Sequence, residues 1–466
     1  MAYLCSTDAD RAEMLAAIGA ESIDELFAGL PNGGRMPALA IPGPASEIEL
    51  AEWMGGLASA NRTLPADRSF LGGGAYRHFV PALVRAVVSR PEFYAPYALS
   101  YSEVHQGTLQ ALYEYQSLMV ALTGMECSNA SLYDGASACA EGVMLARRLT
   151  GRGAVVVSAA LNAGVRQVVR TYATGPGLDV RQAPYDSDSG ATTGLEPLVD
   201  EHTAAVVIQY PNAFGVLEDV AAVAELARSR GALLVVQADP VALAMLRPPG
   251  ELGADIVVGE GQPLGLALSC GGLSLGFLTT RLAYLDEVPG AVVEVARDQH
   301  GRRGFAVRDY GERDRSLLRE RARSNVGTTS TLPAIAAAVY LAALGPHGLR
   351  RVAELAFHRT HYLAESLAAL PGCRVRFSGP FFREFAVSVG TSADELADRV
   401  RARGFLAGLP LGRWYPELGD CLLLTCGEGT PRAAIDQFVA TLSGEREGGA
   451  APNGRDAARL ALREPA

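Results

Sequence analysis

The chain has 466 residues, of which 49% are hydrophobic and 20% are charged, and its formal net charge is -10. This composition is typical of a globular protein with a sizeable core, and the mixture of acids and arginines disfavours a general affinity for nucleic acid or anionic membranes. No apolar run approaches the ~18 residues of a membrane span, and the N-terminus turns acidic where a secretory signal would be apolar.

Residues 1–70 are predicted to form an N-terminal helical segment. The stretches ADRAEMLAAIG and SEIELAEWMGGLASAN carry apolar residues at helical spacing, and Ser46 is placed to cap the second of them. Prolines at 31, 37, 42 and 44 predict an extended connection between these helices.

Residues 71–335 are predicted to form a large α/β domain. Short apolar runs alternate there with helical stretches such as ASACAEGVMLARRL and DVAAVAELARSRG, which indicates a doubly wound, mostly parallel sheet with strands buried on both faces. The predicted strands are AVVVSA (154–159), LDVRQAP (178–184), AAVVIQY (204–210), ALLVVQA (232–238), ADIVVG (254–259) and LGFLTT (275–280).

Residues 336–443 are predicted to form a smaller α+β domain. The long helical stretch GLRRVAELAFHRTHYLAESLAAL precedes the strand-like runs CRVRFS, REFAVSV and DCLLLTC, with helical patterns between and after them. Residues 444–466 are polar and rich in Gly and Ala, and we expect them to be a disordered tail.

Two motifs invite a functional interpretation that their surroundings do not support. His358 and His361 lie at i, i+3 on a helix, but no carboxylate or cysteine stands at a matching position, so packed or solvated histidines are favoured over a metal site. The run LGGGAY (71–76) lacks the strand and helix that flank a dinucleotide loop, and it predicts a tight turn near a ligand or a partner.

Two other stretches stand where a parallel sheet binds its ligand. In DGASACAEG (134–142) small residues lead into a helix, whose first N–H groups could face an anion, although ordinary capping gives the same pattern. Asp239 follows the strand ALLVV and would point at the ligand crevice. In enzymes that use pyridoxal phosphate (PLP), an Asp here pairs with the pyridine nitrogen; a helix cap or a hydrogen bond at the core edge is the open alternative.

The Gly-rich turn GEGQPLG (259–265) follows a buried strand, and in many α/β enzymes of this type such a turn carries the lysine that holds PLP. This chain has no lysine, because all 41 of its Lys and Arg residues are Arg. A guanidinium is protonated at physiological pH and cannot act as an amine nucleophile. The chain alone therefore cannot hold PLP through a Schiff-base lysine. Its seven cysteines are scattered without a CxxC pair, which predicts free thiols in a reducing cytoplasm.

Several stretches, in order over about residues 1 to 442, together resemble one family. They are FLGGGAYRHFVP (70–81), YAPY (94–97), EVHQGTLQALYEYQ (103–116), LTGMECSNASLYDGASACAEG (122–142), ADPVALAMLRPPGELGADIVVGEGQPLG (238–265), ARSNVGTT (322–329), GPFFREF (379–385) and GRWYPELGD (412–420). The chain is similar to the alpha subunit of the glycine-cleavage P-protein, glycine dehydrogenase (decarboxylating), which forms the N-terminal half in fused members.

The resemblance implies the aspartate-aminotransferase-like fold of PLP enzymes, fold type I. It also implies that the chain pairs with a homologous beta subunit, that this partner holds PLP on its own lysine, and that two such pairs associate as α2β2. The assembly would decarboxylate glycine and pass the aminomethyl group to the lipoyl arm of the H-protein. No metal is expected. Relic positions of cofactor contacts would be Asp134, Ser137, Asp239, Gln262 and Pro263, the last near the expected lysine position.

The same resemblance implies that a connection between helices lies near the partner subunit and the substrate channel. The candidates for that role are Tyr94, Tyr97, Glu103, His105 and Gln106, with Ser324 and Asn325 in second place. Tyrosines are also enriched at interfaces for their contact area alone, so a purely structural role at the subunit interface stays open.

The chain departs from the family pattern at several of these places. ALSYS, between YAPY and EVHQG, is longer than the usual linker, and His105 stands where the family mostly has serine, as in EISQG. The usual MPGR reads EVPGA (287–291), and REQHIRREKATSNICT reads RDRSLLRERARSNVGTT. Three functions are therefore carried forward: the alpha subunit of a standard glycine dehydrogenase, a relative acting on another small amino acid or acceptor, and a non-catalytic regulatory or binding protein.

Overall fold

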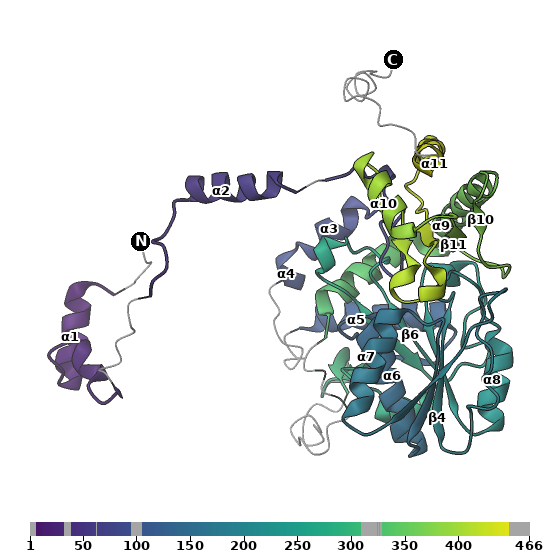
Figure 1. Cartoon of the computed structure of the whole chain (residues 1–466). Helices are drawn as coiled ribbons and strands as arrows, with labels where there is room; N and C mark the ends of the chain where they lie inside the picture. Colours follow the sequence, from purple (N-terminus) through teal and green to yellow (C-terminus); the bar gives the residue numbers. More distant parts are fainter. Residues whose placement is uncertain are drawn as a thin grey trace. The chain divides into compact units, whose positions relative to one another are not determined.

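The computed structural model describes residues 6–31, 39–61, 63–94, 105–308, 324, 326 and 329–446. The chain divides into two compact units, Met1–Thr63 and Leu64–Ala466 (Figure 1). The predicted positions Tyr97, Glu103 and Asn325 and most of the predicted tail lie outside the described residues, whereas the last helix continues to Arg446.

The first unit contains helices α1 (Asp8–Ile18) and α2 (Glu47–Ser59) and the 3-10 turn η1 (Asp24–Phe27). Each α-helix starts with a capping box, in which the N-cap hydroxyl accepts from the third helical N–H and the third side chain accepts from the N-cap N–H. Ser46 caps α2 as predicted. Neither helix buries a residue, so local capping rather than a core supports them.

The second unit is built around a seven-stranded sheet of order β1-β7-β6-β5-β4-β2-β3. Its strands are β1 (Cys127–Ser128), β2 (Ala154–Ser158), β3 (Asp179–Ala183), β4 (Thr203–Tyr210), β5 (Leu233–Ala238), β6 (Ile256–Glu260) and β7 (Gly276–Thr280). β2 to β6 are parallel, and β7 and β1 add antiparallel edges. The expected doubly wound, mostly parallel sheet is confirmed, with all six predicted strands in place.

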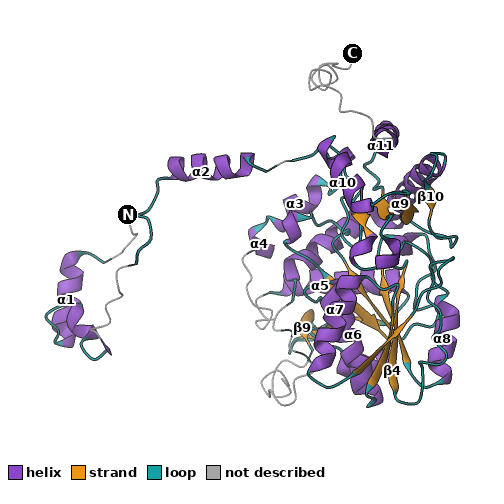
Figure 2. Ribbon diagram, in the orientation of Figure 1, coloured by secondary structure: helices purple, strands orange, loops and turns teal. Residues whose placement is uncertain are grey.

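Helices cover both faces of this sheet (Figure 2). One face packs against α6 (Gly135–Thr150) and α7 (Ala163–Thr174), and the other against α5 (Gln106–Thr123), α8 (Val220–Ser229) and α9 (Thr331–Ala368). Apolar side chains on both faces of β4, β5 and β6 are thus taken out of water, which explains why these strands read as continuous apolar runs.

The other elements of the unit are short helices, a hairpin and a second sheet. The remaining α-helices are α3 (Ala82–Val88), α4 (Pro91–Tyr94), α10 (Ala393–Ala402) and α11 (Arg432–Arg446). The hairpin consists of β8 (Val293–Arg297) and β9 (Arg303–Val307). The second sheet has the order β10-β11-β13-β12 and comprises β10 (Arg374–Val375), β11 (Glu384–Ser388), β12 (Leu409–Pro410) and β13 (Cys421–Thr425). All pairs in this sheet are antiparallel, and its helix-covered core is separate from that of the large sheet.

Helix α9 connects the cores of the two sheets. Its residues pack in the core of the large sheet on both sides of a break at Gly345 and Pro346, and its last turns pack in the core of the small one. By length and composition α9 could cross a membrane, but half of its most apolar window is buried inside the protein. Its packing is that of a core helix.

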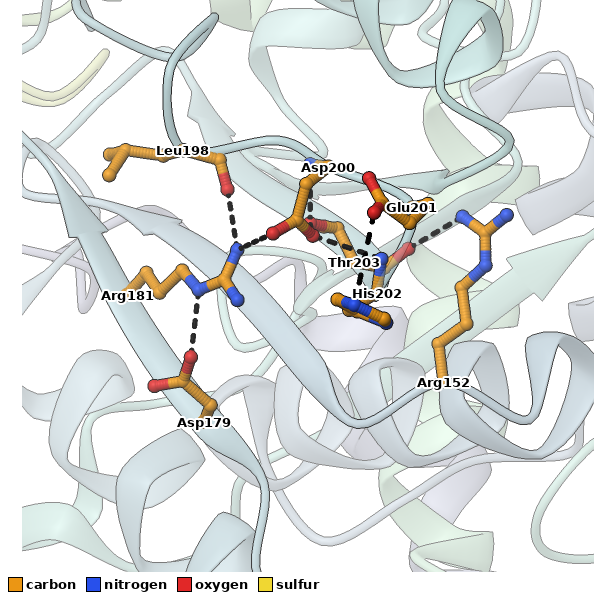
Figure 3. A network of polar contacts seen from close by, with 8 residues as sticks. All are labelled: Arg152, Asp179, Arg181, Leu198, Asp200, Glu201, His202 and Thr203. Carbon is orange, nitrogen blue, oxygen red and sulfur yellow. Dashed lines mark hydrogen bonds and ion pairs between the residues drawn. The ribbon is translucent and has the colours of Figure 1, made fainter.

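A polar network holds the amino ends of β3 and β4 together (Figure 3). The Arg181 guanidinium donates to Asp179 at 2.7 Å, to Asp200 at 2.7 Å and to the Leu198 carbonyl at 3.0 Å, and Arg152 donates to the Thr203 carbonyl at 3.0 Å. The hydrogen bond from Arg181 is the main reason that the pKa of Asp200 falls to about 2. Open α/β sheets bind their ligands outside the carboxyl ends of the strands, so a ligand site of this sheet is to be sought at the edge opposite to this network.

The two sheets meet at Gly215, which we expect to tolerate no side chain. Gly215 has φ +84°, and a Cβ there would lie 1.9 Å from the Glu384 carbonyl oxygen. Gly215→Ala is expected to lower the free energy of unfolding by about 3 to 5 kcal/mol through the sum of backbone strain and overpacking. Chemical denaturation measures the loss.

Gly151→Ala is the matched control for this prediction. Gly151 also has a positive φ, +69°, but no atom lies within 4 Å of its Cβ position, so only the strain of about 1 kcal/mol should appear. Equal losses in the two variants would contradict the close approach of the two sheets.

Candidate functional site

The carboxyl edge of the large sheet brings together all five positions predicted as relic cofactor contacts. Asp239 directly follows β5, Gln262 and Pro263 follow β6, and Asp134 and Ser137 stand at the start of α6. Ligands of open α/β sheets bind at this edge, in the crevice outside the carboxyl ends of the strands.

The start of α6 is bound by two carboxylates of the chain itself. Asp134 is the N-cap and accepts from the Ser137 N–H at 2.7 Å and from its hydroxyl at 3.1 Å. Glu260 Oε2 accepts from the Gly135 N–H at 2.9 Å and from the Ser274 hydroxyl at 2.6 Å. Glu260 Oε1 accepts from the N–H groups of Gln262 at 2.8 Å and of the residue after Ser274 at 3.0 Å. Burial raises the pKa of the Glu260 carboxyl, and these hydrogen bonds oppose that shift.

Asp239 is bound by an arginine from the smaller domain. Arg383 Nε lies 2.7 Å from Asp239 Oδ2, and the two side chains are only 5% and 12% exposed. The guanidinium carbon also lies 3.6 Å from the centre of the Tyr76 ring. A buried ion pair of this kind is costly to break from one side, because the remaining charge stays in a medium that solvates it poorly.

The next residue, Glu384, organises the glycine turn LGGGAY. Glu384 accepts from the Gly73 N–H at 2.6 Å and from the Tyr76 hydroxyl at 2.7 Å. A Cβ on Gly72 would lie 2.0 Å from Glu384 Oε1, so this turn needs glycine to close around the carboxylate. Burial raises the pKa of Glu384. The turn that the sequence predicts near a ligand or a partner thus closes around Glu384, which belongs to the same chain.

Gln262 and His78 fix the GEGQPLG turn against the same segment. The Gln262 amide accepts from the Tyr76 N–H at 2.9 Å and donates to the Tyr76 carbonyl at 3.1 Å. His78 Nε2 lies 3.2 Å from the Gly265 N–H and must accept from it, while Nδ1 lies 3.2 Å from the Tyr76 carbonyl and must donate. These bonds require a neutral imidazole, and burial lowers the pKa of His78 in the same direction.

The residues predicted near the partner subunit have different surroundings. Tyr94 ends α4 with 75% of its surface exposed, and His105 is half-buried at the N-cap of α5. The Gln106 amide pairs with both backbone groups of Phe305, at 2.8 Å each, so it holds the hairpin β8–β9. Ser324 donates to the buried Glu141 at 2.6 Å.

Of the two histidines at i, i+3, His361 packs against a neighbouring segment of the chain. His361 Nε2 bonds the Phe381 carbonyl at 3.1 Å, and its ring stacks on that of Phe381 at 4.1 Å. Among the described residues, no group of three or more His, Cys, Asp or Glu side chains could hold a metal ion.

Sequence reasoning missed Glu260, Arg383, Glu384 and Glu141. All four stand in stretches already noted, GEGQPLG, GPFFREF and DGASACAEG, and charged residues inside such apolar or Gly-rich surroundings are the signal that could have marked them.

The family is decided by comparison with known proteins. The sequence model of the glycine cleavage system P-protein matches residues 1–442. The chain belongs to this family. Relatives named probable glycine dehydrogenase (decarboxylating) subunit 1 are 45% identical over 452 residues in Thermomicrobium roseum and 44% identical over 444 residues in Prosthecochloris aestuarii. Each alignment covers 95% of this chain and 99% of the relative.

Solved structures agree with this assignment. A crystal structure of glycine decarboxylase (P-protein) of the glycine cleavage system superimposes with a TM-score of 0.87 at 39% identity, covering 95% of this chain and 99% of that one. Two more distant structures share the fold alone. A Burkholderia pseudomallei sphingosine-1-phosphate lyase has a TM-score of 0.65 at 17% identity, covering 92% of this chain and 95% of that one. A Lactobacillus brevis glutamate decarboxylase has a TM-score of 0.64 at 15% identity, covering 91% of this chain and 97% of that one. The expected fold type I architecture of PLP enzymes is confirmed.

PLP is the cofactor of this fold type, and the residues of this chain do not fit it. The chain has no lysine. Asp239, the partner expected for a pyridine nitrogen, is bound to Arg383 at 2.7 Å. The first N–H of α6, where a phosphate would be expected, is bound by Glu260 at 2.9 Å.

Removing the arginine of the buried pair should destabilise the protein strongly. Arg383→Met leaves Asp239 buried without a partner, and we expect a loss of about 3 to 5 kcal/mol in the free energy of unfolding. The double variant with Asp239→Asn should lose less than the sum of the two single variants, by about 2 kcal/mol. Urea denaturation measures all three.

Arg350→Met is the control for the pair. Arg350 binds Glu354 at 3.0 Å, but its side chain is 61% exposed, so a loss below about 1 kcal/mol is expected. Strict additivity of the Arg383 and Asp239 effects would contradict the proposed coupling.

The neutral state of His78 predicts a dependence of stability on pH. Its folded pKa lies below the unfolded value of about 6.5, so the unfolded chain binds more protons as the pH falls below that value. The stabilisation is fully present above about pH 6.5 and is lost progressively below it. Carboxyls with raised pKa values have the opposite sign, so the comparison of variants isolates the histidine.

In denaturation between pH 5 and 8, His78→Gln should lose most stability at the upper end, so that its curve falls less steeply toward acid than that of the unchanged protein. His202→Gln, at a histidine with a 74% exposed side chain, should leave the slope unchanged. Parallel curves for His78→Gln and the unchanged protein would show that His78 titrates normally.

Proposed function

We propose that this chain is the lysine-free alpha subunit of a two-subunit, PLP-dependent glycine decarboxylase, the P-protein of the glycine cleavage system. The family match over residues 1–442 and the near-complete alignment with relatives named subunit 1 support the reaction and the division into subunits. The observation that carries the proposal is the internally bound crevice, where Arg383 binds Asp239 and Glu260 binds the start of α6. Such a chain needs its cofactor chemistry from elsewhere.

The name subunit 1 carried by the relatives implies a partner subunit. In this proposal the partner is a homologous chain that bears a lysine and holds PLP, whose ring accepts the electrons released by decarboxylation. The two chains form αβ pairs that associate as α2β2 in the cytoplasm, and the aminomethyl group passes to the lipoyl arm of the H-protein.

This chain would wall and orient the shared active site. Tyr94 supports that role, because a 75% exposed aromatic side chain offers a large contact surface to a partner. His105 and Ser324 are further candidates for the channel, together with Tyr97, Glu103 and Asn325, which lie outside the described residues. Gln106 would act indirectly by holding the hairpin β8–β9.

A second candidate function is the same two-subunit architecture acting on another small amino acid or acceptor. His105, which replaces the usual serine of the family motif, favours it. A non-catalytic role, the third possibility from the sequence, would leave the complex inactive toward every amino acid.

The substrate is tested by exchange of labelled bicarbonate into the carboxyl group of an amino acid. The chain co-purified with its lysine-bearing homologue should exchange glycine faster than alanine or serine by roughly tenfold or more, because an extra methylene or hydroxyl must fit the same small site. Faster exchange of another amino acid would establish the second candidate instead, and no exchange of any would establish the third.

His105 is tested in the same complex. If His105 shapes the substrate channel, His105→Ser should change the ratio of glycine to alanine exchange by roughly tenfold. His300→Ser, in the exposed turn of the hairpin β8–β9, is the control and should leave the ratio unchanged. An unchanged ratio in His105→Ser would remove this residue from the channel.

A further inference from the structure

The crevice at the carboxyl edge of the large sheet contains one anionic and one cationic side chain at the two places where a phosphorylated ligand with a basic nitrogen would be held. We propose that Glu260 and Arg383 are built-in occupants of this crevice. The Glu260 carboxylate takes the place of the ligand's anion at the start of α6, and the Arg383 guanidinium takes the place of its cationic nitrogen against Asp239. This inference concerns the chain by itself and does not depend on the proposed activity.

Glu260 is bound as a ligand's oxyanion would be. Its two oxygens accept four hydrogen bonds of 2.6 to 3.0 Å, from the start of α6, from the turn after β6 and from two residues that precede β7. Backbone N–H groups at a helix start together with a hydroxyl are the usual donors to a bound phosphate.

The backbone segments around Glu260 pack closely against one another. A Cβ on Gly135 would lie 2.7 Å from the Glu260 nitrogen, and a Cβ on Gly276 would lie 2.3 Å from the Asp134 carbonyl oxygen. Three segments of the chain thus meet in direct contact around the carboxylate. An external phosphate can reach the donors only if the Glu260 side chain leaves.

Arg383 is an independent sign that this edge is a ligand site now filled from within. Both oxygens of Asp239 are already engaged by the chain itself, because one accepts from Arg383 at 2.7 Å and the other from the Val241 N–H at 3.0 Å. The Arg383 side chain is only 5% exposed, yet its Nη2 has no hydrogen-bond partner within the part of the chain that the structure describes. A buried, charged donor is therefore left over at the edge where a ligand would be bound.

Removing the Glu260 carboxylate should uncover the lost anion site. Glu260→Ala removes an acetate-sized group and frees its four donors. The probes are acetate, inorganic phosphate and PLP, each measured by calorimetric titration and by the shift of the melting temperature of the isolated chain. We expect the unchanged chain to bind none of them measurably, and the variant to bind phosphate and PLP at least roughly tenfold more tightly than the unchanged chain.

Glu218→Ala is the matched control. Glu218 is also buried and accepts four hydrogen bonds, from Thr192 and Asn212, but none of these donors is the N–H of a helix. It should gain no affinity for phosphate or PLP. Equal gains in both variants would mean that any vacated buried carboxylate creates such a site, which would overturn the proposal.

If Glu260→Ala does not fold, Glu260→Asp replaces it in the same binding measurements. Its side chain is shorter, so it withdraws the carboxylate from the Gly135 N–H and keeps the charge nearby. A gain of phosphate and PLP binding by either folded variant supports the proposal. Rescue by acetate alone, or no gain in any folded variant, contradicts it and makes Glu260 an ordinary structural carboxylate. This experiment measures only ligand binding by the isolated chain. Its outcome is therefore independent of whether the two-subunit complex shows glycine–bicarbonate exchange.

Discussion

A single buried guanidinium connects the two halves of the large unit. Arg383 leads into the small sheet and binds Asp239 at the end of the central strand β5 at 2.7 Å, while its own carbonyl accepts from the hydroxyls of Thr360 at 3.1 Å and Thr425 at 2.6 Å. A charge placed in so little water is tolerated only when it is paired and hydrogen-bonded. Arg383 thus joins the small sheet to the carboxyl end of β5, while Glu384 holds the glycine turn and Glu260 holds the start of α6.

The same constraint applies to the other buried charges at the carboxyl edge of the large sheet. Arg383 binds Asp239, Glu384 accepts from the Gly73 N–H, and Glu260 accepts from the Gly135 N–H. The fold keeps its crevice edge well ordered from within, so the chain can present a rigid wall to a partner.

This arrangement also separates binding of the cofactor from construction of the channel. The chain has no lysine and no vacant acidic partner for a pyridine nitrogen, whereas Tyr94 is exposed. In the proposed complex, a change at a channel candidate such as the half-buried His105 would leave the internal bonds of Arg383 and Glu260 intact. Substrate choice and fold stability would then depend on different residues.

The sequence predicted the large sheet well, because strands buried on both faces leave continuous apolar runs that local patterns detect. It missed the hairpin β8–β9, in which only the two end positions Val293 and Val307 are buried and whose backbone is held by the side chains of Gln106 and Gln116. Asp239 and Gln262, predicted as relic cofactor positions, follow β5 and β6 at the carboxyl edge of the sheet. Their partners were not foreseen, because Arg383 lies 144 residues from Asp239 and Tyr76 lies 186 residues from Gln262. Only the folded chain brings such residues together.

The central claim is that this chain supplies one half of an active site whose covalent half belongs to another chain. The most direct test holds the lysine-bearing homologue at fixed concentration, adds this chain in increasing amounts and measures glycine–bicarbonate exchange. We predict no exchange from either chain alone and a rise that saturates at an equimolar mixture. Full exchange by either chain alone would contradict the claim.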